Sequence, residues 1–153
     1  SVWVVLDHKE TYYTRRYLTA NQGIAASYTT KLAATTNVTE IGNLWDAVGD
    51  KIVVPTGMTG WLDTTFSNAT YSEYHSGGVS FWIDGSTYYN YMNTGQGGEG
   101  SRQNSQGATM KILVTSAQYL EYYIWNYQNN ATNYTSGGDS TKAQFTCTFT
   151  RTY

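Results

Sequence analysis

The residues best suited to chemistry in this chain are aromatic. Trp82 is followed closely by Tyr88, Tyr89 and Tyr91, with asparagine and aspartate nearby. Flat rings of this kind stack on the apolar faces of sugars, while neighbouring polar groups hydrogen-bond the hydroxyls. These four residues form a candidate glycan-binding group. Packing inside the fold, or against a sister subunit, is the alternative interpretation.

A second aromatic group lies in the segment Tyr119–Gln128. At the two-residue period of a strand, one face carries Leu120, Tyr122 and Ile124. The opposite face, which is polar in an ordinary strand, carries Tyr119, Glu121, Tyr123, Trp125 and Tyr127. Amphipathic aromatics are favoured at interfaces. We therefore expect a sister subunit, another sheet or a glycan to cover this face.

Catalytic and metal chemistry find little support in the sequence. His8 and His75 stand in unrelated contexts, and no G-x-S-x-G motif is present. Cys147 is the only cysteine and lies on an apolar strand face, which favours a buried, inert thiol. A carboxylate pair for glycoside hydrolysis depends on proximity in space, so the sequence leaves it open. We predict no catalytic residue, no metal ligand and no cofactor.

Three aspartates are candidate calcium ligands, but the sequence favours a structural role for each. Asp46 and Asp50 flank a loop, and Asp84 occupies a hairpin tip. Aspartate at such positions more often closes a turn. The glycines between Gly95 and Gly100 lack the Lys-Ser/Thr pair of a phosphate-binding loop.

The charge pattern excludes two classes of partner. Charged residues make up 13% of the 153 residues, and the net charge is −2, so no basic surface for nucleic acid is expected. No apolar run reaches the roughly 18 residues of a membrane span. We interpret Lys9, Arg15 and Arg16, with Glu10 beside them, as a solvated strand or loop edge.

We predict that these residues are positioned by short β-strands within a single domain, residues 1–153. The predicted strands are Val2–Leu6, Ser27–Ala33, Lys51–Pro55, Trp61–Phe66, Val79–Ile83, Tyr88–Met92, Ala108–Thr115, Tyr119–Gln128 and Ala143–Tyr153. Asp84-Gly85 marks a tight hairpin, because glycine readily takes a positive φ. Thr94–Gly107 is predicted to be a long loop. Many strands without helices indicate an all-β sandwich or jelly roll.

The order of several short motifs resembles the C1q/tumour-necrosis-factor-like jelly roll. Leu44-Trp45-Asp46 precedes Asp50–Pro55, and Gly60-Trp61-Leu62 opens the next strand, as in that family. Leu120–Gln128 and the closing strand Phe145–Phe149 also resemble the family pattern. Ala117-Gln118 departs from it, because the family usually has Gly-Asp there.

The resemblance implies an antiparallel, ten-stranded jelly-roll β-sandwich that assembles as a homotrimer and is not an enzyme. It implies a head domain at the C-terminal end of a longer fibrous protein, on a phage or viral fibre or a microbial surface. Such a head contacts a cell-surface glycan or protein receptor and is found on the virion surface or outside the cell. The predicted subunit interface comprises Tyr119, Tyr123, Trp125 and Tyr127. The alternatives are a carbohydrate-binding module and a structural capsid or decoration jelly roll.

Overall fold

A computed structural model describes residues 10–24, 29–33, 35–72, 76–94, 102–126, 134–135 and 143–152. These residues form thirteen strands, eight of which are seven residues or longer. All of their pairings are antiparallel. The described residues include no helix long and apolar enough to cross a membrane. The structure is all-β, as the sequence predicts.

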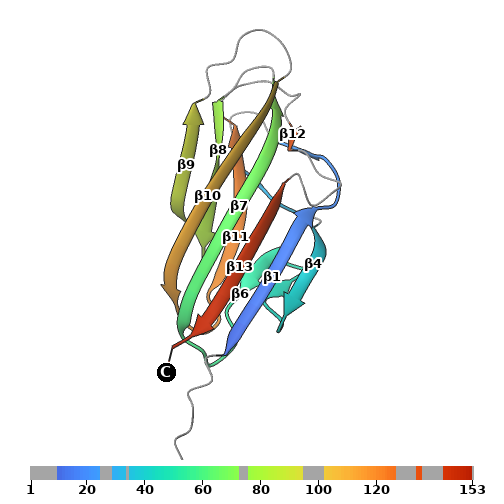
Figure 1. The fold of residues 1–153 in the computed structure, drawn as a ribbon. Helices are drawn as coiled ribbons and strands as arrows, with labels where there is room; N and C mark the ends of the chain where they lie inside the picture. Colours follow the sequence, from blue (N-terminus) through green and yellow to red (C-terminus); the bar gives the residue numbers. More distant parts are fainter. Residues whose placement is uncertain are drawn as a thin grey trace, which may run out of the picture.

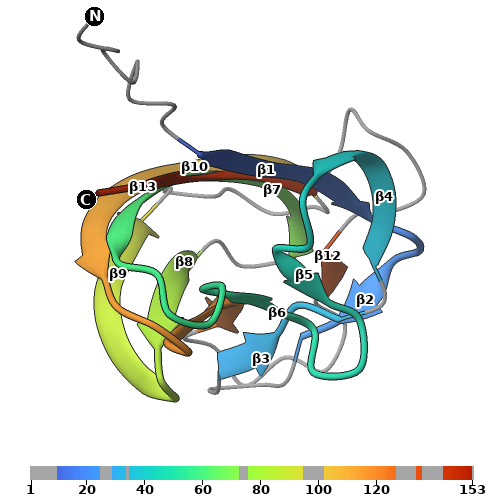
Figure 2. The same cartoon turned by 90° about the horizontal axis from the view of Figure 1, so that it is seen from below.

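The strands form two layers (Figures 1 and 2). The β7 sheet contains β1 (Thr11–Leu18), β2 (Gln22–Gly23), β4 (Thr35–Ile41), β7 (Gly60–Ser72), β10 (Arg102–Val114), β12 (Tyr134–Thr135) and β13 (Gln144–Arg151). The β11 sheet contains β3 (Thr29–Lys31), β5 (Trp45–Asp46), β6 (Lys51–Val53), β8 (Ser76–Ile83), β9 (Ser86–Thr94) and β11 (Tyr119–Asn126). In the β7 sheet, β7 pairs with β10 on one side and with β13 on the other. In the β11 sheet, β11 lies between β8 and the pair β3 and β6.

Tyr122 lies at the centre of the core between the two sheets. Its ring stacks on Phe145 at 4.2 Å between centroids and contacts Phe66 and Phe81 at 5.7 and 5.8 Å. Thr64 Oγ1 donates to the Thr146 carbonyl at 2.7 Å, so the Tyr122 hydroxyl donates to Thr64 Oγ1, at 2.6 Å. The hydroxyl is thus satisfied without water, and this large amphipathic ring is wholly buried.

The predicted hairpin at Asp84-Gly85 is confirmed. Both residues have positive φ, 51° and 73°, and Ile83 pairs directly with Ser86. These dihedrals belong to the two-residue turn whose twist matches that of the flanking strands. The Asp84 carboxylate also joins this turn to the start of strand β11, because it accepts hydrogen bonds from the Tyr119 N–H at 3.0 Å and from the Gln118 side-chain amide at 2.8 Å.

Two sequence-based expectations were wrong. The predicted loop Thr94–Gly107 is strand from Arg102 onward, because β10 pairs with β7 along its whole length. Arg16 is not a solvated edge residue but is 8% exposed on the inner side of β1. Its guanidinium donates to Glu40 Oε2 at 3.2 Å and to Thr35 Oγ1 at 2.9 Å, and lies 4.9 Å from the centre of the Trp45 ring.

The structure confirms several other predicted strands, and one predicted strand lies outside the described residues. Strands are confirmed at Lys51–Pro55, Trp61–Phe66, Val79–Ile83 and Ala143–Tyr153, but the second is much longer than predicted, because β7 continues to Ser72. Ser27–Ala33 contributes only the short strand β3. The segment Val2–Leu6 lies outside the described residues.

Candidate functional site

The outer face of the β11 sheet carries a stacked aromatic pair. Trp82 on β8 lies next to Tyr123 on β11, with ring centroids 4.2 Å apart and planes inclined by 23°. The indole N–H of Trp82 donates to Ser80 Oγ at 3.0 Å, which fixes the ring along its own strand. The β8–β9 register shifts between Phe81 and Trp82, where β9 has one extra residue, and Trp82 keeps its regular pairing with Glu121 on β11. The sequence places Trp82 and Tyr123 in two separate candidate groups and does not predict that their rings stack.

Two ion pairs flank this aromatic pair. Lys31 donates to Glu121 Oε1 and, at 2.6 Å, to the Gly49 carbonyl. Glu121 is only 8% exposed. Burial raises the pKa of the Tyr123 hydroxyl, and the nearby Glu121 carboxylate raises it further. The Tyr123 hydroxyl therefore stays neutral across the physiological range.

The second ion pair joins Lys51 to Asp46 across 3.9 Å. Lys51 Nζ also lies 4.4 Å from the centre of the Tyr119 ring, in cation–π contact. The backbone N–H groups of Gly49 and Val48 donate to the Asp46 carboxylate and lower its pKa. Each described lysine on this face is thus matched by an acidic partner.

The structure describes the predicted site residues only in part. Tyr119 and Tyr123 are half-buried on the same outer face. The backbone of Trp125 pairs with Gly78 and Thr29, while its side chain and all of Tyr127 lie outside the described residues. The predicted subunit interface therefore remains a prediction.

The predicted glycan group is described to a similar extent. Trp82 lies on the outer face beside Tyr123. The register of β9 pairs Tyr89 with Phe81 and Tyr91 with Val79. The side chains of Tyr88, Tyr89 and Tyr91 lie outside the described residues, so their part in a glycan site remains a prediction.

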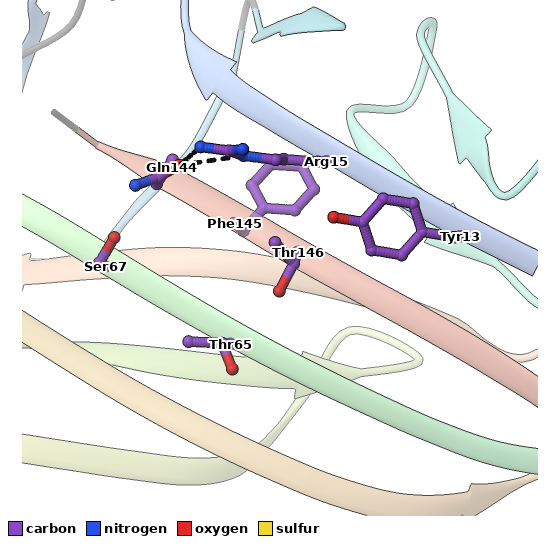
Figure 3. Close-up of a pocket in the computed structure, with 7 residues that line it drawn as sticks. All are labelled: Tyr13, Arg15, Thr65, Ser67, Gln144, Phe145 and Thr146. Carbon is purple, nitrogen blue, oxygen red and sulfur yellow. Dashed lines mark hydrogen bonds between the residues drawn. The ribbon is translucent and has the colours of Figure 1, made fainter. Parts of the chain in front are cut away.

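The outer face of the β7 sheet contains two hollows along β13. The first, about 280 Å³ and shown in Figure 3, is lined by Tyr13, Arg15, Thr65, Ser67, Gln144, Phe145 and Thr146. Arg15 donates to Gln144 Oε1 there at 3.0 and 3.3 Å. The second, about 300 Å³, is lined by Trp61, Asp63, Lys111, Thr148 and Thr150. Both exist because the outward side chains of β13 are shorter than the aromatic and basic side chains beside them.

Among the described residues, no cluster of histidine, cysteine and carboxylate side chains is arranged to hold a metal ion. Burial raises the pKa of the Cys147 thiol to about 12, so this thiol remains protonated. A protonated, buried thiol is a poor nucleophile. His8 and His75 lie outside the described residues.

Comparison with known proteins adds evidence on the fold. No family model matches the sequence, and no curated protein matches it. Murine APRIL at pH 5.0 superposes with a TM-score of 0.69 and 12% identity, over 92% of this chain and 99% of that one. An Eiger TNF from S. frugiperda gives 0.66 and 7%, over 95% and 93% of the two chains.

The globular domain of zebrafish complement 1qA protein gives a TM-score of 0.55 at 11% identity, over 93% of this chain and 96% of that one. Identities this low are evidence on the fold only. The agreement spans nearly the full length of both types of protein. The chain therefore has the antiparallel jelly-roll fold of the tumour-necrosis-factor and C1q proteins.

Proposed function

We propose that the chain is a non-enzymatic, homotrimeric head domain that is displayed outside the cell or on a virion and binds a surface partner. The fold supports this proposal, since proteins of this fold include cytokine and complement heads. The main support for self-association is an exposed apolar surface on the outer face of the β7 sheet. We call this surface the β7/β10 face.

The β7/β10 face centres on Trp61 and Leu113, which pair directly across β7 and β10. They are 42% and 50% exposed. Ile41, a further exposed apolar residue, lies opposite Tyr13 on the same side of the sheet. Fully burying a side chain of this size stabilises by about 1.5–3 kcal/mol. A second copy covering the face would therefore gain free energy from residues that the monomer leaves in water.

The charges on this face suit contact with a copy of the same chain. Asp63 and Lys111 are direct cross-strand neighbours of opposite sign. Arg15 is hydrogen-bonded to Gln144. The short threonine side chains on β13 would let a second copy of the chain approach the sheet closely. In a cyclic trimer each protomer offers two different surface patches, so a mixed apolar and hydroxyl face is compatible with closure.

The interface predicted from the sequence, on the outer face of β11, is the rival proposal. Covering that face with a copy of the chain would enclose the Lys31–Glu121 and Lys51–Asp46 pairs. Removing ion pairs from water costs free energy that their mutual attraction often fails to recover. The β7/β10 face also carries the charges of Asp63 and Lys111, with Lys111 Nζ 5.7 Å from the centre of the Trp61 ring. It is our first choice because Trp61 and Leu113 leave more apolar surface in water there.

Light scattering after size-exclusion chromatography tests both proposals. The intact chain is expected to have three times the mass of one chain at micromolar concentration. A double variant Trp61→Ser/Leu113→Ser is expected to be monomeric and folded, while Tyr119→Ser/Tyr123→Ser remains trimeric. The reverse result would support the β11 face instead. A clean monomer for the intact chain would overturn the trimer.

The proposed setting is the exposed end of a phage or viral fibre, or of a microbial surface protein. The support is compositional: few charges, a single cysteine and many uncharged polar residues. The sequence encoded immediately before Ser1 tests this. Collagen-like or coiled-coil repeats are expected there, and a globular enzyme domain in that place would contradict the setting.

A further inference from the structure

The stacked pair Trp82–Tyr123 has features of a binding platform rather than of a packing contact. Both side chains are half-buried on an outer sheet face, so part of each ring is open to solvent. The β8–β9 register shifts next to Trp82, because Phe81 pairs with Tyr89 while Trp82 pairs with Thr87, which leaves one extra residue on β9. Bulges are over-represented beside functional sites, where they set the direction of a side chain.

The platform is held rigidly before any ligand arrives. Ser80 accepts the indole N–H of Trp82. Asp84, two residues beyond Trp82, joins the β8–β9 turn to β11 through Tyr119 and Gln118. Little conformational entropy remains to be lost at these rings, and such preorganisation increases the affinity of a binding site.

The charges around the platform restrict the class of ligand. Lys31 is paired with Glu121, and Lys51 is paired with Asp46. The described part of this face therefore presents no unmatched lysine to an anionic ligand. A flat protein partner would have to dehydrate both ion pairs, which is costly. A small hydrated ligand can cover the rings and leave the exposed parts of Lys31, Lys51 and Asp46 in water.

We propose that Trp82 and Tyr123 form a binding site for neutral oligosaccharides, with the apolar face of a sugar ring lying against the aromatic pair. The Tyr123 hydroxyl and the edge of the Lys31–Glu121 pair are placed to hydrogen-bond sugar hydroxyls. This inference rests on the proposed function only in that the chain is displayed on a surface. The site lies on the outer face of the β11 sheet, whereas the β7/β10 face belongs to the other sheet.

An array of neutral and sialylated oligosaccharides is the first probe, applied to the intact chain. The strongest neutral ligand is then titrated in solution by calorimetry, where multivalent attachment to a surface does not contribute. We expect selective binding of neutral glycans. Trp82→Ala is expected to weaken binding by about tenfold or more, and Trp82→Phe, which keeps a smaller ring, by less.

Trp61→Ala is the matched control, because it removes a tryptophan from the opposite sheet. It is expected to leave the affinity per chain unchanged, even if it disrupts assembly. Light scattering on the same samples separates the two proposals, since Trp82→Ala should keep the mass of the intact chain. Binding confined to sialylated glycans, no glycan binding, or full affinity in both folded Trp82 variants would each overturn the site.

Discussion

Burial of Cys147 changes the pH range in which its thiol loses a proton. The thiol has an ordinary pKa of 9.0 and a folded pKa of about 12, because it is buried. Between these values the folded state holds a proton that the unfolded state has released. The free energy of unfolding therefore falls as the pH rises from about 9, by about 1.4 kcal/mol per pH unit for one such group. The buried Tyr122 hydroxyl adds to this decline above pH 10.0.

Replacing Cys147 by serine, which does not titrate in this range, is expected to remove the decline between about pH 9 and about pH 10. Denaturant unfolding of both proteins at about pH 8 and about pH 10 measures the two slopes. The same slope in both would mean that other groups cause the alkaline instability.

Ala117 adopts a backbone conformation that favours glycine. Its φ is 65°, in the turn between β10 and β11. A non-glycine residue costs roughly 1–2 kcal/mol there, of which glycine's larger unfolded-state entropy returns a part. Ala117→Gly is expected to stabilise the fold by about 0.5–1 kcal/mol in denaturant unfolding. Ala47→Gly, in an exposed turn with negative φ, is the control and should destabilise slightly.

Gly60 shows how closely the strands of the β7 sheet approach one another. A Cβ at this position would lie 2.3 Å from the Thr150 carbonyl oxygen and 2.8 Å from the Phe149 ring. At Gly107, also in the β7 sheet, the nearest atom is the Phe66 carbonyl oxygen at 3.5 Å, an ordinary contact. Gly60→Ala is expected to destabilise by about 2 kcal/mol or more, and Gly107→Ala by less than about 0.5 kcal/mol. Thermal melting of both variants measures the difference, and equal losses would contradict it.

The elements that the sequence predicted are those whose buried face is apolar. Phe145, Cys147 and Phe149 alternate with threonines on β13, and the period alone identifies the strand. β1 shows the same burial alternation, but its inner residues are Thr14, Arg16 and Leu18. Arg16 is tolerated there because Glu40 and Thr35 hydrogen-bond its guanidinium. Those partners come from β4, so no local pattern could reveal this strand.

For the whole molecule, self-association through the β7/β10 face should depend little on salt. The face is largely apolar and hydroxylic, and Asp63 and Lys111 oppose each other within one chain. Raising the salt from about 50 mM to about 500 mM shortens the screening length several-fold but leaves apolar burial intact. The mass measured by light scattering is expected to stay that of a trimer. Dissociation at high salt would point to an interface made of ion pairs.

The all-β class, the Asp84-Gly85 hairpin, the buried cysteine and the two different faces of β11 could all be predicted from the sequence. These properties follow from side-chain period and backbone preference, which act locally. Three contacts could not be predicted in this way: Trp82 stacks on Tyr123, Lys31 pairs with Glu121, and Trp61 lies opposite Leu113 on an exposed face. Each of these contacts joins strands distant in the chain, and their register is set by the packing of the whole sandwich.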